Sequence, residues 1–227
     1  MKRTLLASVW MALSILLPLG GTARGDPFTV TVDISSITGL DFELEFLLFD
    51  IDGVIGNTSL LVDNVFIRDL GGVITPPGLI DFETGGFEGF VPDPLDPGNT
   101  NVIPGGFAAG AGGSFLLELA ESTVVFPSLT FRDFLPSSAT TLQFDFELVT
   151  LSATDFMVAS ILDPFTLLPF PTIPDLLGFG DFLESSSAGH LVAGGVGVEI
   201  VPVPGALLLG CIGLAFANWK LQRRKDS

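Results

Sequence analysis

Apolar and polar residues alternate along several short segments between residues 26 and 200, a pattern typical of strands with one buried face. In the segment 41–50, Phe42, Leu44 and Phe46 share one face, and acidic residues lie on the other. No long segment has the period of an amphipathic helix. The pattern predicts strands over residues 28–34, 41–50, 59–67, 114–119, 123–131, 142–149, 155–161 and 190–200.

Clusters of glycine, proline, asparagine and serine separate most of these segments, as turns separate antiparallel strands. Many short strands with such turns predict an all-β fold, an antiparallel β-sandwich that is jelly-roll-like. Two long connections, 85–113 and 163–181, are rich in glycine or proline. Loops of this length are either functional or disordered. The second also contains Phe and Leu, so we expect it to pack over one end of the sandwich.

The first 25 residues have the order of a secretory signal peptide. Lys2 and Arg3 precede an apolar segment, 5–17, and Pro18, Gly20 and Gly21 then interrupt it. Cleavage after Ala23 or after Gly25 satisfies the preference for small residues. The alternative is an uncleaved membrane anchor, since residues 4–23 carry no charge. The helix-breaking residues favour cleavage.

The C-terminal residues 201–227 have three parts. A proline-containing segment comes first and an uncharged apolar run to Trp219 follows it. A basic group then ends the tail: Lys220, Arg223, Arg224 and Lys225. The order predicts a single transmembrane helix whose basic end stays in the cytoplasm, with residues 26–200 exported. The alternative is a buried C-terminal helix of a soluble domain.

This tail resembles the PEP-CTERM sorting signal of Gram-negative bacteria, in which a Pro-x-Pro motif precedes a short transmembrane helix and an arginine-rich end. The motif residues are Val201, Pro202, Val203, Pro204, Gly205 and Ala206. Val203 stands where the family's eponymous glutamate would be. The resemblance implies that an exosortase, a membrane cysteine protease, cuts the chain near the motif. The mature protein would then be at the cell envelope or outside the cell.

The exported segment resembles, more loosely, a group of small PEP-CTERM proteins of unknown function. The matching residues are Thr29 to Asp33, the stretch 36–40, and the Phe-x-Leu-x-Phe strand that begins at Phe42. The resemblance implies no catalytic residues.

The exported segment is strongly acidic. Residues 26–200 contain 25 acidic side chains against only Arg68 and Arg132, a formal charge of −23. Such a surface repels phosphate backbones, so the composition argues against nucleic-acid binding. The charge either attracts divalent cations and basic partners or serves solubility alone.

Little in the sequence suggests catalysis. His190 is the only histidine and Cys211, in the apolar run of the tail, is the only cysteine, so we expect no triad, disulfide or cysteine metal site. No glycine-rich loop has a phosphate-binding pattern. We expect a non-enzymatic structural or interaction role, as in a biofilm matrix. The alternative is a module that binds exopolysaccharide, against which the absence of Trp and Tyr from residues 26–200 argues.

Calcium is the one cofactor that the sequence raises. Asp50 and Asp52 lie in a turn-like stretch, and Asp93 and Asp96 lie in a second one rich in oxygen ligands. Hard oxygen ligands at alternate positions can converge on one Ca²⁺ ion. Position 12 of an EF-hand loop starting at Asp50 would be Leu61, so the motif is not an EF-hand. Ordinary turn chemistry, in which Asp bonds its own backbone, is the other interpretation.

Overall fold

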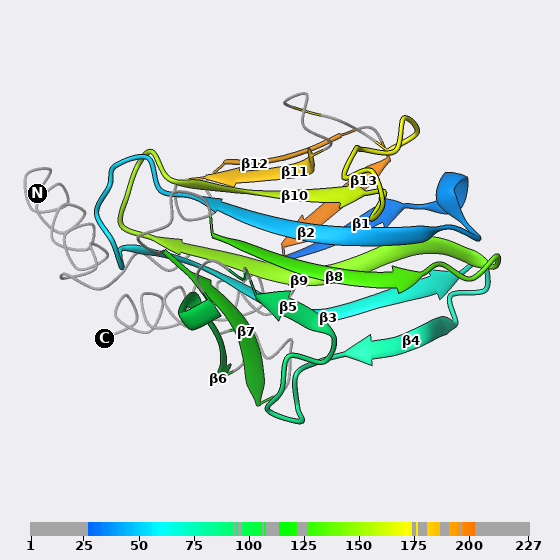
Figure 1. Cartoon of the computed structure of the whole chain (residues 1–227), viewed down its shortest axis with the longest axis horizontal. Coiled ribbons are helices and arrows are strands. Elements are labelled where there is room, and N and C mark those ends of the chain that lie inside the picture. Colours follow the sequence, from blue (N-terminus) through cyan, green and yellow to red (C-terminus); the bar gives the residue numbers. More distant parts are fainter. Residues whose placement is uncertain are drawn as a thin grey trace, which may run out of the picture.

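Two antiparallel sheets lie face to face in a computed structural model of the chain (Figure 1). The structure describes residues 27–202, apart from 93, 95–96, 106, 108–113, 122–126, 174–175, 177–180, 187–190 and 196. The all-β prediction, with antiparallel strands in two packed sheets, is confirmed. The predicted signal peptide, and the tail beyond Pro202, lie outside the described residues.

The first sheet has the strand order β13-β1-β9-β3-β7-β6, with β4 also paired to β3. Its strands are β1 (Phe28–Asp33), β3 (Thr58–Asp69), β4 (Ile74–Ile80), β6 (Thr100–Pro104), β7 (Phe115–Ala120), β9 (Ala139–Thr150) and β13 (Val198–Pro202).

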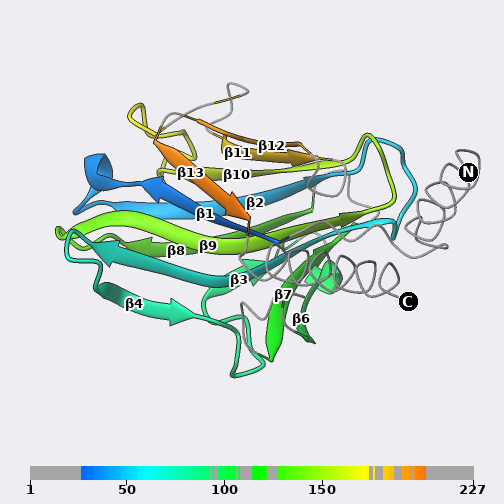
Figure 2. The same cartoon turned by 180° about the vertical axis from the view of Figure 1, so that it is seen from behind.

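The second sheet has the strand order β12-β11-β10-β2-β8-β5. Its strands are β2 (Asp41–Phe49), β5 (Phe90–Pro92), β8 (Ser128–Phe134), β10 (Phe156–Leu162), β11 (Asp181–Ser186) and β12 (Leu191–Gly194). The described helical residues are confined to two short 3₁₀ turns, η1 (Ser35–Ile37) and η2 (Pro97–Asn99). Figure 2 shows the same layers from behind.

Most of the predicted strands form, and the differences concern edges and loops. The predicted strand 190–200 is wrong as one element, because its residues divide between β12 and β13 in different sheets. Gly197, with a positive φ of 87°, lies in the turn between them. The predicted loop 85–113 contains β5 and β6. In the predicted loop 163–181, Ile173 is buried while Phe165 is 82% exposed, so the segment covers the core only in part.

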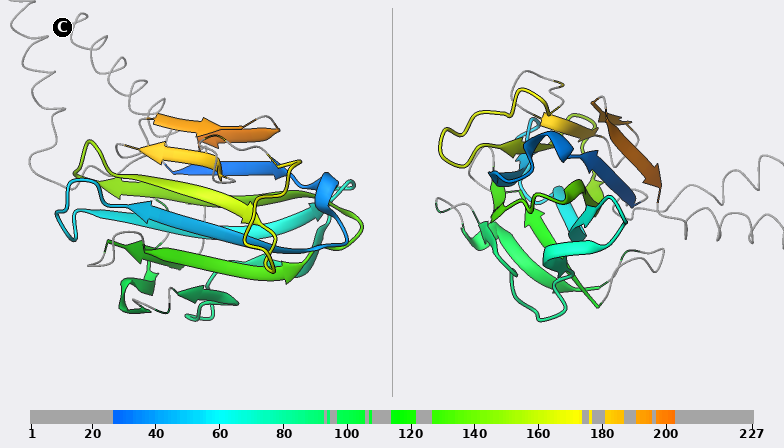
Figure 3. Two further views of the ribbon diagram at one scale, coloured as in Figure 1. Left: turned by 45° about the horizontal axis from the view of Figure 1, so that its top comes forward. Right: turned by 90° about the vertical axis from the view of Figure 1, so that its right-hand side faces the viewer.

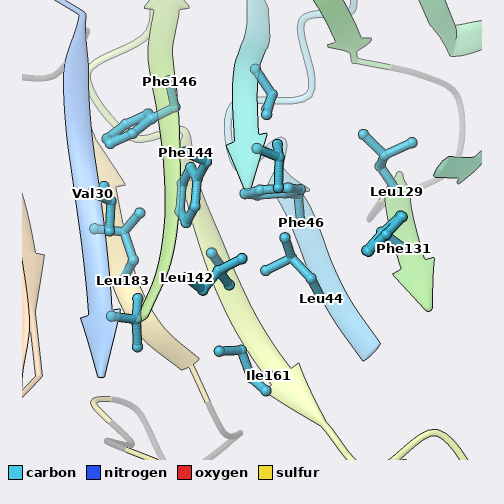
Figure 4. Close-up of a cluster of buried hydrophobic side chains, with 14 of the residues drawn as sticks. Val30, Leu44, Phe46, Leu129, Phe131, Leu142, Phe144, Phe146, Ile161 and Leu183 are labelled. Carbon is cyan, nitrogen blue, oxygen red and sulfur yellow. The ribbon is translucent and has the colours of Figure 1, made fainter. Parts of the chain in front are cut away.

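The core forms where the inward faces of the two sheets meet (Figure 4). Phe46 of β2 lies edge-on to Phe144 of β9, with 5.2 Å between ring centroids and 81° between planes. Both side chains are fully buried. Their neighbours include Leu44 on β2 and Phe146 on β9, which follow at the two-residue period of a strand. The predicted inward face Phe42, Leu44 and Phe46 is therefore correct.

The sheets approach most closely along one side, where their edge strands β12 and β13 lie next to each other (Figure 3). A Cβ atom on Gly194 of β12 would lie 2.9 Å from the Val198 side chain and 3.0 Å from that of Ile200, both on β13. Any larger residue at position 194 must push the two edge strands apart. Glycine at this position lets the sandwich close along that side.

We predict that Phe144→Ala destabilises the fold by about 3–5 kcal/mol, because it removes a buried ring from the contact between the sheets and leaves a cavity. Phe165→Ala is the matched control, since its ring is 82% exposed, and should change the free energy of unfolding by less than about 0.5 kcal/mol. Urea unfolding of both variants measures the difference. Equal losses for the two variants would show that the core is placed wrongly.

Candidate functional site

Three carboxylates from three connections meet at one end of the sandwich, where the β2–β3 and β9–β10 loops lie side by side (Figure 1). Asp50 follows β2, Glu121 follows β7, and Asp155 directly precedes β10. One oxygen of each lies within 4.8 Å of an oxygen of both others. We call these three residues the acidic cluster. Because β7 belongs to the first sheet and β2 and β10 to the second, the cluster spans both layers.

Strand register brings the three residues together. In the antiparallel pair of β2 and β10, Phe49 lies opposite Phe156, and the two rings stack with 4.5 Å between centroids. Asp50 and Asp155 are the next residues outward on the two strands and so face each other. On the other sheet, the Glu121 amide donates to the Thr58 carbonyl at 3.1 Å, which continues the pairing of β3 with β7.

Asp155 fastens the β2–β3 loop to the sandwich. Its side chain is completely buried. Its Oδ1 accepts the amides of Ile51, at 2.9 Å, and Asp52, at 3.3 Å. Its Oδ2 accepts the Thr58 hydroxyl at 2.9 Å. A buried carboxylate with three donors is stabilised in its ionised form.

Glu121 is also buried, but its carboxylate accepts fewer hydrogen bonds than that of Asp155. Its side chain is 4% exposed, and Oε2 accepts the Asn57 amide at 2.9 Å. Its Oε1 is buried and has no hydrogen-bond partner among the described residues. An unpaired buried carboxylate oxygen is costly unless a proton or a cation satisfies it.

The two buried carboxyls have opposite pKa shifts. Burial is the largest cause that raises the pKa of Glu121. The Thr58 side chain opposes it as the second-largest cause, the facing Asp155 side chain adds to the rise, and the Asn57 amide acts against it. Burial also acts to raise the pKa of Asp155, but the Ile51 amide, the Thr58 hydroxyl and other donors outweigh it and lower this pKa. These surroundings therefore favour the charged form of Asp155 more than that of Glu121.

The two arginines of residues 26–200 are engaged elsewhere. Arg132 forms an ion pair with Glu43. Arg68 donates to the Gly72 carbonyl at 2.7 Å, and its guanidinium lies 4.5 Å from the centroid of the Phe66 ring. Since residues 26–200 contain no lysine, no lysine or arginine of these residues is left to neutralise the acidic cluster.

The four predicted calcium ligands differ in their positions and contacts. Asp50 belongs to the acidic cluster, where its Oδ1 also accepts the Gly53 amide at 2.6 Å. Asp52 is outside the cluster, because its oxygens accept the Val54 amide and the Asn57 side-chain amide within the loop. The turn interpretation thus describes Asp52. Asp93 and Asp96 lie outside the described residues.

Sequence reasoning missed Glu121 and Asp155. Each stands just outside a strand, among 25 acidic residues of the exported segment, and neither belongs to a local motif. The signal that could have found Asp155 is the antiparallel pairing of β2 with β10, which requires the residues after Phe49 and before Phe156 to meet.

The predicted sorting motif begins within the edge strand β13. Val201 and Pro202 are the last residues of β13, opposite Thr29 and Phe28 of β1. Proline is tolerated at this edge position because the strand has a neighbour on one side only. Val203, Pro204, Gly205, Ala206 and the basic group lie outside the described residues. Within the part of the chain that the structure describes, no helix is long and apolar enough to cross a membrane.

Comparison of the chain with protein-family models, with curated proteins and with solved structures gives no match.

We predict that Asp155→Ala costs about 2–4 kcal/mol of unfolding free energy, because three buried or half-buried donors lose their acceptor. Asp163→Ala is the control. Asp163 also accepts two loop amides, those of Phe165 and Thr166, but on an exposed loop, so the loss should be about 0.5 kcal/mol. Chemical denaturation compares the two variants. If Asp155→Ala cost no more than Asp163→Ala, the carboxylate would not fasten the β2–β3 loop.

Proposed function

We propose that this chain is a non-enzymatic protein exported by a Gram-negative bacterium, cut by an exosortase near its Pro-x-Pro motif, and released to the envelope or extracellular matrix. The observation that carries the proposal is the pairing of the first described strand with the last. Phe28 of β1 lies opposite Pro202 of β13. The first and last described strands therefore pair with each other, between the predicted signal peptide and the predicted tail.

This pairing supports a cut on the C-terminal side of Pro202. Removal of the residues after Pro204 would leave the whole of β13 in the first sheet, with Val198, Ile200 and their neighbours still packed against the core. A cut before Val201 would take the last two paired residues from the edge strand. The folded domain therefore tolerates loss of the tail, and also loss of residues 1–25.

The non-enzymatic part of the proposal rests on the burial of the acidic cluster. Asp155 is fully buried and Glu121 is 4% exposed. A pair of catalytic carboxyls must flank a bound substrate, with room between them for a scissile bond. In this cluster, by contrast, loop amides and the Thr58 hydroxyl occupy both oxygens of Asp155 and one oxygen of Glu121.

We further interpret the architecture as jelly-roll-like. The chain passes from one sheet to the other between β1, β2 and β3, and again between β7, β8 and β9. The late strand β9 lies between β1 and β3, and β8 pairs with β2. Early and late strands that interleave across two sheets are the Greek-key feature of a jelly roll.

The processing proposal predicts the mass of the mature protein. Material recovered from outside the inner membrane should begin near Asp26 and end close to Pro204, because both targeting segments have been removed. Changing Pro202 and Pro204 together to Ala should leave the uncut precursor in the inner membrane. Intact-mass measurement of each fraction reads out the two ends.

The control for this measurement is Pro169→Ala, a proline in a described loop far from the motif along the chain, which should leave processing unchanged. Recovery of mature protein that retains Arg223, Arg224 and Lys225 at its final location would contradict the proposal.

One surface supports polysaccharide binding as a second candidate function. A hollow at the β2 and β8 ends is lined by Phe165, Phe134, Arg132 and two aspartates, Asp41 and Asp133. The Phe165 and Phe134 side chains are 82% and 53% exposed. Exposed rings beside a few polar groups are what a sugar ring needs for stacking and hydrogen bonding.

If the chain has this second function, a glycan array should show saturable binding to a polysaccharide that is neutral or that tolerates the acidic surface of the protein. Phe165→Ala should weaken this binding about tenfold or more, since the stacking surface is lost. Leu151→Ala, at another exposed apolar position, is the control. An array without saturable binding would remove this candidate and leave the structural role.

A further inference from the structure

The acidic cluster has a shape suited to one bound cation. Two ligands at about 2.4 Å from a Ca²⁺ ion lie at most about 4.8 Å apart. The oxygens of Asp50, Glu121 and Asp155 all lie within 4.8 Å of one another. Separations of this size are compatible with one ion that contacts all three carboxylates.

A second observation, independent of the number of acids, points to a missing partner. Glu121 is 4% exposed, and its buried Oε1 lacks a hydrogen-bond donor among the described residues. The other oxygen of the same carboxyl is fixed by the Asn57 amide, so the side chain is held in the cluster. A side chain placed in this way leaves one strong acceptor for a ligand that the described residues do not supply.

The surroundings of the acidic cluster favour a cation from outside residues 26–200 as this partner. Residues 26–200 contain no lysine, and Arg68 and Arg132 contact Gly72 and Glu43 instead. Hard carboxylate oxygens prefer Ca²⁺ or Mg²⁺ to softer metals. Ca²⁺ accepts six to eight ligands in flexible geometry, whereas Mg²⁺ demands a tighter octahedron at about 2.0–2.1 Å.

We propose that Asp50, Glu121 and Asp155 bind one Ca²⁺ ion, which joins the β2–β3 loop and the β9–β10 turn to the end of β7 and so ties the two sheets together. Asp50 is the half-buried member. Asp155 and Glu121 are the buried members. Asp52, which caps the same loop with both of its oxygens, is not a ligand.

The test uses the full-length chain in detergent, freed of metal with a chelator, and titrates CaCl₂ in a calorimeter. The wild type should bind one Ca²⁺ ion per chain with a Kd of about 10⁻⁴–10⁻³ M, the range of extracellular calcium modules. At about 10 mM Ca²⁺ its melting temperature should rise by about 3–8 °C, and EGTA should reverse the rise. Mg²⁺ should bind at least about tenfold more weakly.

Matched variants separate ligation from loop structure. Asp50→Asn and Glu121→Gln should each weaken Ca²⁺ binding at least about tenfold, because each replaces a charged ligand by a neutral one. Asp52→Asn removes the same charge from the same loop and should leave the Kd within about twofold. Without Ca²⁺, Glu121→Gln should melt no lower than the wild type, since its amide oxygen still accepts the Asn57 amide and a buried charge is gone.

Three results would overturn the proposal: no binding and no change in melting temperature at about 10 mM Ca²⁺, equal loss of affinity in Asp52→Asn and Asp50→Asn, or binding of Mg²⁺ as tight as that of Ca²⁺. If Glu121→Gln fails to fold, the Ca²⁺ affinities of Asp50→Asn and Asp52→Asn still test the proposal, since both positions lie in the loop and are not fully buried.

Discussion

The contact between the inward faces of the two sheets is the interaction on which the rest of the structure depends. Its centre is the edge-to-face pair of Phe46 and Phe144. The chain has 21 phenylalanines and no tyrosine, so its aromatic core side chains need no buried hydrogen-bond partner. Because strand side chains alternate, burying these rings places the neighbouring acids on the opposite face of each sheet, where Asp145 and Glu147 are also buried. A segment with a formal charge of −23 thus folds around an apolar interior.

How far the sequence predicts the fold depends on whether a strand is central or at an edge. β2 and β9 lie within their sheets, and each contains a stretch in which apolar and polar residues alternate, so this pattern predicted them. The predictions missed β4, β5 and β6, which contain proline and lie at edges of the sheets. An edge strand needs backbone hydrogen bonds on one side only, so it tolerates proline and weak alternation and gives little signal. β11 was also missed, since Asp181 to Ser186 lacks that alternation.

The acidic cluster was less predictable than the fold because long-range pairing makes it. Asp50 was noticed through a local turn pattern, and the same pattern included Asp52, whose oxygens serve the loop itself. Glu121 and Asp155 are distant from Asp50 in the sequence, and only the strand order brings them to one end of the sandwich. A sequence pattern can identify acids in a turn. It cannot tell a carboxylate that caps its own loop from one that faces two others.

The account rests most on the claim that the sandwich is complete between β1 and β13, whose edge pairing joins the two ends of the described chain. Amide hydrogen exchange on a fragment of residues 26–202 tests this claim directly. We expect the β1 and β13 amides that take part in strand pairing to be protected from exchange together with those of β9. They should exchange only in the global unfolding of the domain. Exchange of the β1 and β13 amides at the rate of an unfolded chain, while β9 stays protected, would contradict it.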